Sequence, residues 1–174
     1  MKASLAPLMS SKNQSWETPD SVFTALEKIY GPFDLDGAAS HDNFKCFLYC
    51  TEEGLFQSYP SGPFLRYGTD GLAARWHTIG NGKVWLNPEY SNCAEWIRKA
   101  YEESQLGATV VCLIPSRTDT KYWHDYVMKA SEVLLVKGRI RFVGAAASAP
   151  FPSAVVVFRP GSHVPHFQSW SVPK

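Results

Sequence analysis

The sequence lacks any long apolar run. No stretch approaches the roughly 18 consecutive apolar residues that a membrane-spanning helix needs. The first fifteen residues also lack the continuous apolar core of a signal peptide. We therefore expect no membrane segment and a cytoplasmic location.

Cysteine is scarce as well. The chain has four, at positions 46, 50, 93 and 112, and their spacings match no zinc or redox signature. Cys112 lies inside an apolar run, where a buried, reduced thiol is the ordinary state. These features exclude a disulfide-built secreted domain and predict no metal site, in agreement with a reducing compartment.

Net charge is nearly absent, at +1 over 174 residues, which excludes strong attraction of nucleic acid to the whole surface. The two halves differ, however. Residues 1–90 carry 7 Lys and Arg against 10 Asp and Glu, and residues 91–174 carry 10 against 6. This asymmetry permits a local basic face in the second half, although a solvated surface would give the same pattern.

Apolar residues are plentiful enough for one packed core, at 45% of the chain. Ser- and Lys-containing residues 1–14 show little periodicity and are expected to form a flexible tail. We expect one domain over residues 15–159 and a second tail over 160–174.

Strand and helix patterns alternate along the domain, which predicts an α/β fold. Because no helical pattern separates the last strands, the sheet should be mostly parallel with an antiparallel end. We expect helices at 19–30, 91–106 and 120–130, strands at 33–36, 84–86, 109–114, 133–136, 139–142 and 154–158, and a loop at 51–69.

The stretch Lys83–Tyr90 carries the most distinctive chemistry. Its apolar run reads as a buried strand that stops at Asn87-Pro88, a pair that starts turns. A polar amide, a rigid carbonyl and the Tyr90 ring would then lie together at the carboxyl end of a strand, where open α/β sheets bind ligands. An ordinary turn with a packed tyrosine is the alternative interpretation.

Asn87-Pro88-Glu89-Tyr90 resembles the Asn/Asp/Ser-Pro-Pro-aromatic motif of amino-group methyltransferases, with Glu89 in place of the second proline. Together with six further segments, it makes the chain similar to the phage-type (Dam-like) DNA N6-adenine methyltransferase family. Those segments are Trp16–Pro19, Phe33–Ser40, Asp70–Leu72 with Trp76, Leu113–Thr120, Gly138–Phe142 and Phe151–Ala154.

The resemblance implies a Rossmann-like S-adenosylmethionine-dependent methyltransferase fold and that cofactor, in the host cytoplasm if a phage encodes the protein. Asp36 would attract the cofactor ammonium, and Asp70 would accept from its adenine amine. Glu52 and Glu53 are candidates for the ribose hydroxyls by position alone. The whole implied cofactor set is Trp16, Thr18, Pro19, Asp36, Gly37, Ala38 and Asp70.

The resemblance also implies a catalytic role for Asn87, Pro88 and Tyr90. The Asn87 side-chain oxygen and the Pro88 carbonyl would accept the two N6 hydrogens of adenine and favour a tetrahedral nitrogen. Tyr90 would stack on the base after it leaves the duplex. Glu89 restores a backbone N–H donor where proline has none, and it adds a carboxylate.

The implied partner is DNA, with a monomer or a homodimer both open and modest sequence specificity expected. Candidates for phosphate or base contact are Arg117, Lys137, Arg139 and Arg141, and Phe142 or Phe151 would fill the gap left by the flipped base. Two alternatives remain: another acceptor amine, such as cytosine N4 or a glutamine amide, or a catalytically weakened protein that binds cofactor or nucleic acid.

Overall fold

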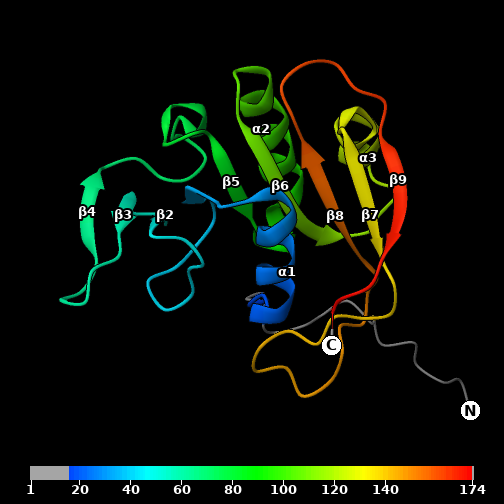
Figure 1. Cartoon of the computed structure of the whole chain (residues 1–174), viewed down its shortest axis with the longest axis horizontal. Coiled ribbons are helices and arrows are strands. Elements are labelled where there is room, and N and C mark those ends of the chain that lie inside the picture. The colour runs from blue at the N-terminus through cyan, green and yellow to red at the C-terminus, as the bar shows by residue number, and fades with distance from the viewer. Residues whose placement is uncertain (1–15, 174) are drawn as a thin grey trace, which may run out of the picture.

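A computed structural model describes residues 16–173. The predicted tail at 1–14 lies outside these residues. In the described part of the chain, nine strands form one sheet in the order β4-β3-β2-β1-β5-β6-β8-β7-β9 (Figure 1). Their bounds are β1 Leu35–Asp36, β2 Leu48–Cys50, β3 Leu55–Gln57, β4 Phe64–Tyr67, β5 Lys83–Leu86, β6 Thr109–Pro115, β7 Glu132–Val136, β8 Ser153–Phe158 and β9 His166–Trp170.

The centre of the sheet is parallel. β2, β1, β5 and β6 run in one direction, whereas β3 and β4 on one side and β8 on the other pair antiparallel with their neighbours. β7 pairs antiparallel with β8 and parallel with β9. The parallel sheet with an antiparallel end is thus confirmed, and antiparallel strands also extend the opposite side.

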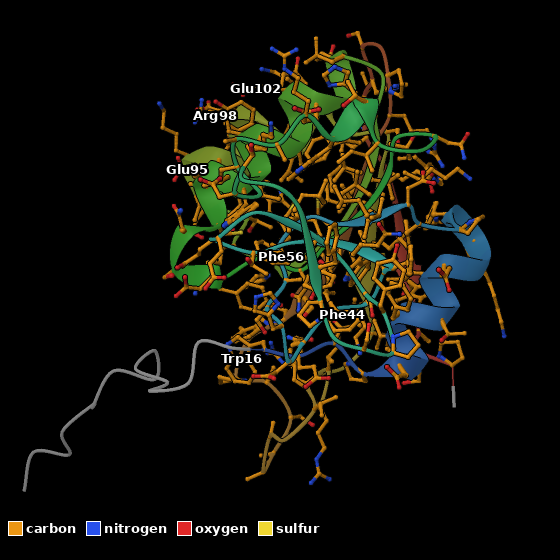
Figure 2. All side chains as sticks on the ribbon, turned by 90° about the vertical axis from the view of Figure 1, so that its left-hand side faces the viewer. Trp16, Phe44, Phe56, Glu95, Arg98 and Glu102 are labelled. Carbon is orange, nitrogen blue, oxygen red and sulfur yellow. The ribbon has the colours of Figure 1, made fainter. Side chains whose placement is uncertain are left out.

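Helices cover both faces of the sheet. α1 (Asp20–Tyr30) packs on one face, and α2 (Cys93–Gln105) and α3 (Lys121–Asp125) pack on the other. The outer face of α2 carries ion pairs from Arg98 to Glu95 and to Glu102, which Figure 2 labels. Short 3-10 helices occur at η1 (Trp76–Thr78), η2 (Tyr90–Asn92) and η3 (Val127–Lys129). The resulting three layers confirm the Rossmann-like α/β architecture.

Two hydrophobic cores follow from the alternation of side chains along the central strands. In β5, Val84 and Leu86 point toward α2, and Trp85 between them points toward α1. The Trp85 ring packs edge-on against Phe23 of α1, with 5.4 Å between ring centroids. The central strand is therefore apolar throughout because both of its faces are buried.

Several element boundaries differ from the predictions. The helix expected at 91–106 begins at Cys93 after η2, and the one expected at 120–130 divides into α3 and η3. The loop expected at 51–69 contains β3 and β4. None of the helices in the described part of the chain has the length and apolarity needed to cross a membrane.

Two predictions near the C-terminus are wrong. Residues 139–142, predicted as a strand, lie in the loop between β7 and β8, because Gly138 turns the chain away at a φ of 84°. Residues 160–174, predicted as a tail, contain β9, which takes the place beside β7. Most side chains of β9 are exposed, so the strand carries no alternating apolar pattern that the sequence could reveal.

Candidate active site

Three parallel strands end side by side at one edge of the sheet. β1 has β2 on one side and β5 on the other, so chain order reverses direction at β1. This reversal point, at the carboxyl ends of the strands, is where open α/β sheets bind ligands. The segments that follow the three strands are residues 37–39, 51–52 and 87–92.

A cleft of about 280 Å³ lies among these segments. Its volume is near the lower end of the range for small-molecule sites, about 300 Å³. Three of its side chains are carboxylates, which suit a positively charged ligand. The cleft is lined by Ala38, Ala39, Cys50, Thr51, Glu52, Asp70, Gly71, Leu72, Glu89, Asn92 and Trp96.

Glycine at position 71 allows two walls of the cleft to meet. A Cβ atom added at Gly71 would lie 2.3 Å from the carbonyl oxygen of Gly37. The buried Trp76 indole packs beneath Gly37 and donates its Nε1–H to the Gly71 carbonyl over 2.9 Å. The spacing Asp70-Gly71-Leu72 with Trp76 therefore shapes the cleft, and any side chain at position 71 would force its walls apart.

An ionic network fastens the Trp76 segment to α2. Glu103, buried on α2, accepts hydrogen bonds from the His77 backbone and ring nitrogens and from Lys99 Nζ at 2.6 Å. Burial acts to raise the pKa of Glu103, but these bonds outweigh burial and hold the pKa below its usual value. The Lys99 ammonium also lies over the Trp76 ring. The network fixes one wall of the cleft.

Asp36 holds the loops around the cleft together. Its carboxylate is 4% exposed and accepts backbone N–H bonds from Lys45 (2.9 Å) and Ala38 (3.3 Å). Burial raises the pKa of Asp36 to about 7, although the two backbone bonds oppose the shift. Of the neighbouring residues, Ala38 lines the cleft and Gly37 supports its wall.

Asp70 is better placed to meet a ligand. It lines the cleft, and its Oδ1 accepts the Ala73 N–H over 2.9 Å, which fixes the carboxylate at the start of a turn. Glu52 lines the same cleft, whereas its neighbour Glu53 lies 3.6 Å from the ring of His41. Of the two acids that the sequence offered for the ribose, the structure brings Glu52 to the cleft.

The Asn87 side chain is held from two sides. Its Nδ2 donates to the main-chain carbonyl of Trp16 over 2.6 Å, and its Oδ1 accepts from the Tyr90 hydroxyl over 3.0 Å. Asn87 is half-buried, Pro88 is buried, and Glu89 next to them is exposed and faces the cleft. Asn87 is not among the residues that line the cleft, but its amide has a defined orientation two residues before Glu89, which does line it.

Tyr90 belongs to a cluster of aromatic rings and is 5% exposed. Its ring meets Phe151 edge-on at 5.5 Å and Phe142 at 6.4 Å, and Trp16 packs 5.3 Å from both phenylalanines. Burial raises the pKa of Tyr90 well above its ordinary value, so the hydroxyl stays protonated and can donate. In this conformation the Tyr90 ring packs in the protein core; it would have to move to stack on a base.

The start of α1 lies beside this cluster. Pro19 occupies the N-cap position, so α1 begins one residue later than the helix predicted at 19–30. Thr18 is buried, and its Oγ1 has no hydrogen-bond partner among the described residues. Trp16, predicted to lie at the cofactor, accepts a hydrogen bond from Asn87 through its main-chain carbonyl, so residues 16–18 adjoin the Asn87–Tyr90 segment.

The basic candidates lie along the continuation of the same edge. Arg117 follows β6 and lies near enough to Tyr90 that its charge partly opposes the burial-driven rise in the pKa of that tyrosine. Lys137, Arg139 and Arg141 are exposed on the β7–β8 loop, which projects beyond the sheet in Figure 1. Figure 2 shows Trp16 at the end of the molecule from which that loop projects.

The two aromatic candidates differ in exposure. Phe142 is 2% exposed and packs in the core beneath α1, and Phe151 is half-buried. Phe142 is therefore a core residue in this structure and could not enter a DNA duplex as it stands. Sequence reasoning did not identify Trp96, Asn92 and Thr51, which line the cleft. Only the assignment of β2 as a strand would have indicated Thr51.

Comparisons with known proteins give one family. A family model described as DNA N-6-adenine-methyltransferase (Dam) matches residues 6–160. A DNA N-6-adenine-methyltransferase of Escherichia phage T1 is 30% identical over 122 residues, 70% of this chain and 44% of that protein. The chain thus spans less than half the length of the phage T1 relative.

A second phage relative is matched over more of its length. A DNA N-6-adenine-methyltransferase of Haemophilus phage HP1 is 28% identical over 158 residues, 86% of this chain and 81% of that protein. Among solved structures, a predicted O-methyltransferase from Agrobacterium tumefaciens matches 52% of this chain and 42% of its own at 15% identity, with a TM-score of 0.36. That structural likeness is too distant to carry an argument.

Proposed function

The chain belongs to the DNA N-6-adenine-methyltransferase (Dam) family, and we propose that it transfers a methyl group from S-adenosylmethionine to the N6 amine of adenine in DNA. One observation carries the proposal: the oriented amide of Asn87 follows β5, and the acidic cleft lies at the ends of β1, β2 and β5, lined by Glu89 two residues further along. A cleft that could hold a cation and an amide that could bond an amine thus follow neighbouring strands at one edge of the sheet.

The residues present fit the cofactor. S-adenosylmethionine supplies a methyl group on a positively charged sulfur, and the carboxylates of Glu52, Asp70 and Glu89 give the cleft the opposite charge. Asp70 would accept from the adenine amine of the cofactor, and Glu52 would bond the ribose hydroxyls. The buried Thr18 hydroxyl has no hydrogen-bond partner among residues 16–173, which supports a ligand contact at the methionine end.

Asn87 and Pro88 would act on the acceptor amine. The N6 lone pair of adenine is delocalised into the ring and is a poor nucleophile. Hydrogen bonds from both N6 hydrogens to the Asn87 Oδ1 and the Pro88 carbonyl favour a tetrahedral nitrogen and stabilise the positive charge that develops on it. The Tyr90 hydroxyl occupies only one of the two lone pairs of Oδ1, so the other can accept from the amine.

DNA would approach along the basic continuation of the edge. Arg117 and the β7–β8 loop, with Lys137, Arg139 and Arg141, would bond phosphates while the target adenine leaves the duplex. Tyr90 would stack on that base only after its ring leaves Phe142 and Phe151. Phe151, half-buried at the same edge, remains the better candidate to fill the gap in the duplex.

The test uses purified protein, labelled S-adenosylmethionine and unmethylated DNA, followed by digestion to nucleosides. Labelled N6-methyladenine supports the proposal. Another labelled nucleoside, such as N4-methylcytosine, would show that the acceptor is a different amine and that S-adenosylmethionine is still the methyl donor. Cofactor binding in a titration without any transfer would instead identify a catalytically weakened binding protein and would contradict the proposed activity.

A further inference from the structure

We propose that the main-chain carbonyl of Trp16 orients the amide of Asn87 for the reaction, which makes Trp16 a positioning residue. The contact joins two segments 71 residues apart, the entrance to α1 and the end of β5, over 2.6 Å. The inference rests on the proposed function because it concerns the same acceptor site. It adds a residue whose role the family motif at 87–90 does not contain.

The chemistry of the partners decides which way the amide faces. A carbonyl has no hydrogen to donate, so only the Nδ2 side of Asn87 can meet the Trp16 oxygen favourably. In the reversed orientation two acceptor oxygens would face each other at that distance. The Asn87 oxygen is therefore directed away from Trp16, where it is available to an amine that must donate.

Tyr90 is compatible with the same orientation from the other side. Its buried hydroxyl donates to Oδ1 over 3.0 Å. Because a hydroxyl can also accept, the Trp16 carbonyl alone decides which way the amide faces. Each functional group of the amide thus has one partner that matches it. Because the Trp16 carbonyl sets the orientation before the substrate binds, the amide need not reorient during the reaction, even if Tyr90 moves to stack on the base.

The Trp16 carbonyl is itself held firmly. The indole ring packs edge-on against Phe151 and tilted against Phe142, with 5.3 Å between centroids in both cases. The carbonyl of the next residue, Glu17, accepts the N–H of Val143 over 3.0 Å. The rings and this backbone bond tie the carbonyl to the β7–β8 loop, so DNA contact with that loop can reach Asn87 through Trp16.

A pH profile of Asn87→Asp separates this role from a general structural one. Ionised, the new carboxylate has no hydrogen for the Trp16 carbonyl and is repelled by it; protonated, its O–H donates there and its other oxygen faces the amine. We expect kcat of this variant to fall by about tenfold per pH unit above the pKa of the new carboxyl. If Trp16 had no such role, the ionised form would be the better acceptor, so a flat or rising profile overturns the proposal.

A second pair of variants tests the anchoring ring. Trp16→Ala removes the aromatic anchor and should lower kcat by about a hundredfold, as misplacement of a reacting group by about 1 Å does. Trp16→Phe retains a ring and the carbonyl and should restore kcat to within a few-fold. Both should keep cofactor and DNA affinity within a few-fold. A loss confined to binding, or an unchanged kcat in Trp16→Ala, would overturn the proposal.

The side-chain amide signal of Asn87 provides a readout without turnover. In NMR spectra of the full chain, the side-chain amide signal of Asn87 is assigned by its absence in Asn87→Ala. One of its two protons should exchange slowly with solvent in wild type. This protection should be lost in Trp16→Ala. A wild-type amide without protection contradicts the contact even if the enzyme is active. Absence of methyl transfer by wild-type protein would count against the proposed function. The exchange rate of the Asn87 amide would still show whether the hydrogen bond to Trp16 exists.

Discussion

The carboxyl edge of the sheet has two regions of opposite charge. Around β1, β2 and β5 the cleft presents the carboxylates of Glu52, Asp70 and Glu89, whereas Arg117 and the exposed cations of the β7–β8 loop follow β6 and β7. The amide of Asn87 lies between the two regions. A net charge of +1 conceals this division, which under the proposed function would give a cationic cofactor and an anionic polymer separate places on either side of Asn87.

The largest effect is expected from removing the Asn87 side chain, which lies between the two regions. Asn87→Ala should lower methyl transfer by about 10²–10³-fold, because one of two preorganised acceptors is lost. Cofactor affinity, measured by calorimetric titration, should stay within a few-fold because Asn87 bonds Trp16 and Tyr90 outside the acidic cleft. Asn81→Ala, on an exposed turn before β5, is the matched control and should leave both quantities unchanged. Equal losses of transfer and of cofactor affinity would place Asn87 inside the acidic region.

The basic region is tested by the double variant Arg139→Ala and Arg141→Ala. Both residues are exposed on the β7–β8 loop. Their removal should weaken DNA binding by about tenfold at low salt and reduce the salt dependence by about one phosphate contact per residue. Cofactor affinity should not change.

The matched control for this loop is the pair Lys28→Ala and Arg98→Ala, which removes the same charge from α1 and from the outer face of α2. Fluorescence anisotropy of labelled duplex DNA over a salt series measures both effects. An equal loss of DNA affinity in the control pair would show that overall charge, rather than the loop, attracts DNA.

The sequence predicted the chemistry of the edge better than its geometry. Strand β5 and the Asn87-Pro88 turn were recognisable because both faces of the strand are apolar and the turn residues break regular structure. The packing of Tyr90 against Phe142 and Phe151 joins segments more than 50 residues apart, and no local pattern encodes it.

Trp16 also makes a contact that local sequence does not reveal. Its position in a family segment indicated the cofactor, but its functional contact in the structure is a main-chain carbonyl, which every residue possesses. Residue identity therefore carried no information about that bond. Glu52 was a candidate by position alone, together with Glu53. Because the strand before it, β2, was not predicted, only the structure distinguishes the two acids.

The buried Asp36 carboxylate, which holds the loops around the acidic cleft together, gives the next prediction. Its folded-state pKa of about 7 lies above the unfolded value of about 4. Between these values the native protein retains a proton that the unfolded chain has released, so this group lowers stability as the pH rises toward 7. Below about pH 4 the penalty is absent, and above about pH 7 it is complete.

Asp36→Asn removes this titration. Urea unfolding of both proteins across that range should give a free-energy difference that changes by about 1.4 kcal/mol per pH unit, with wild type losing stability relative to the variant as the pH rises. The exposed Asp42→Asn serves as the control and should follow wild type. Parallel curves for wild type and Asp36→Asn would show that the Asp36 carboxyl titrates alike in the folded and unfolded chain.

The smallest expected effect concerns the carboxylate nearest the border. Glu89 is exposed, so solvent screens its charge, and Glu89→Gln should weaken S-adenosylmethionine binding only a few-fold, most at low salt. The demethylated product, whose sulfur is neutral, should be affected less. Glu102→Gln on the outer face of α2 controls for net charge. Glu89→Pro is compatible with the φ of −59° at position 89. If Glu89→Gln left cofactor affinity unchanged and bound DNA more tightly, the Glu89 carboxylate would belong to the DNA-binding region, where it repels phosphate. The boundary between the two regions would then lie on the cofactor side of Asn87.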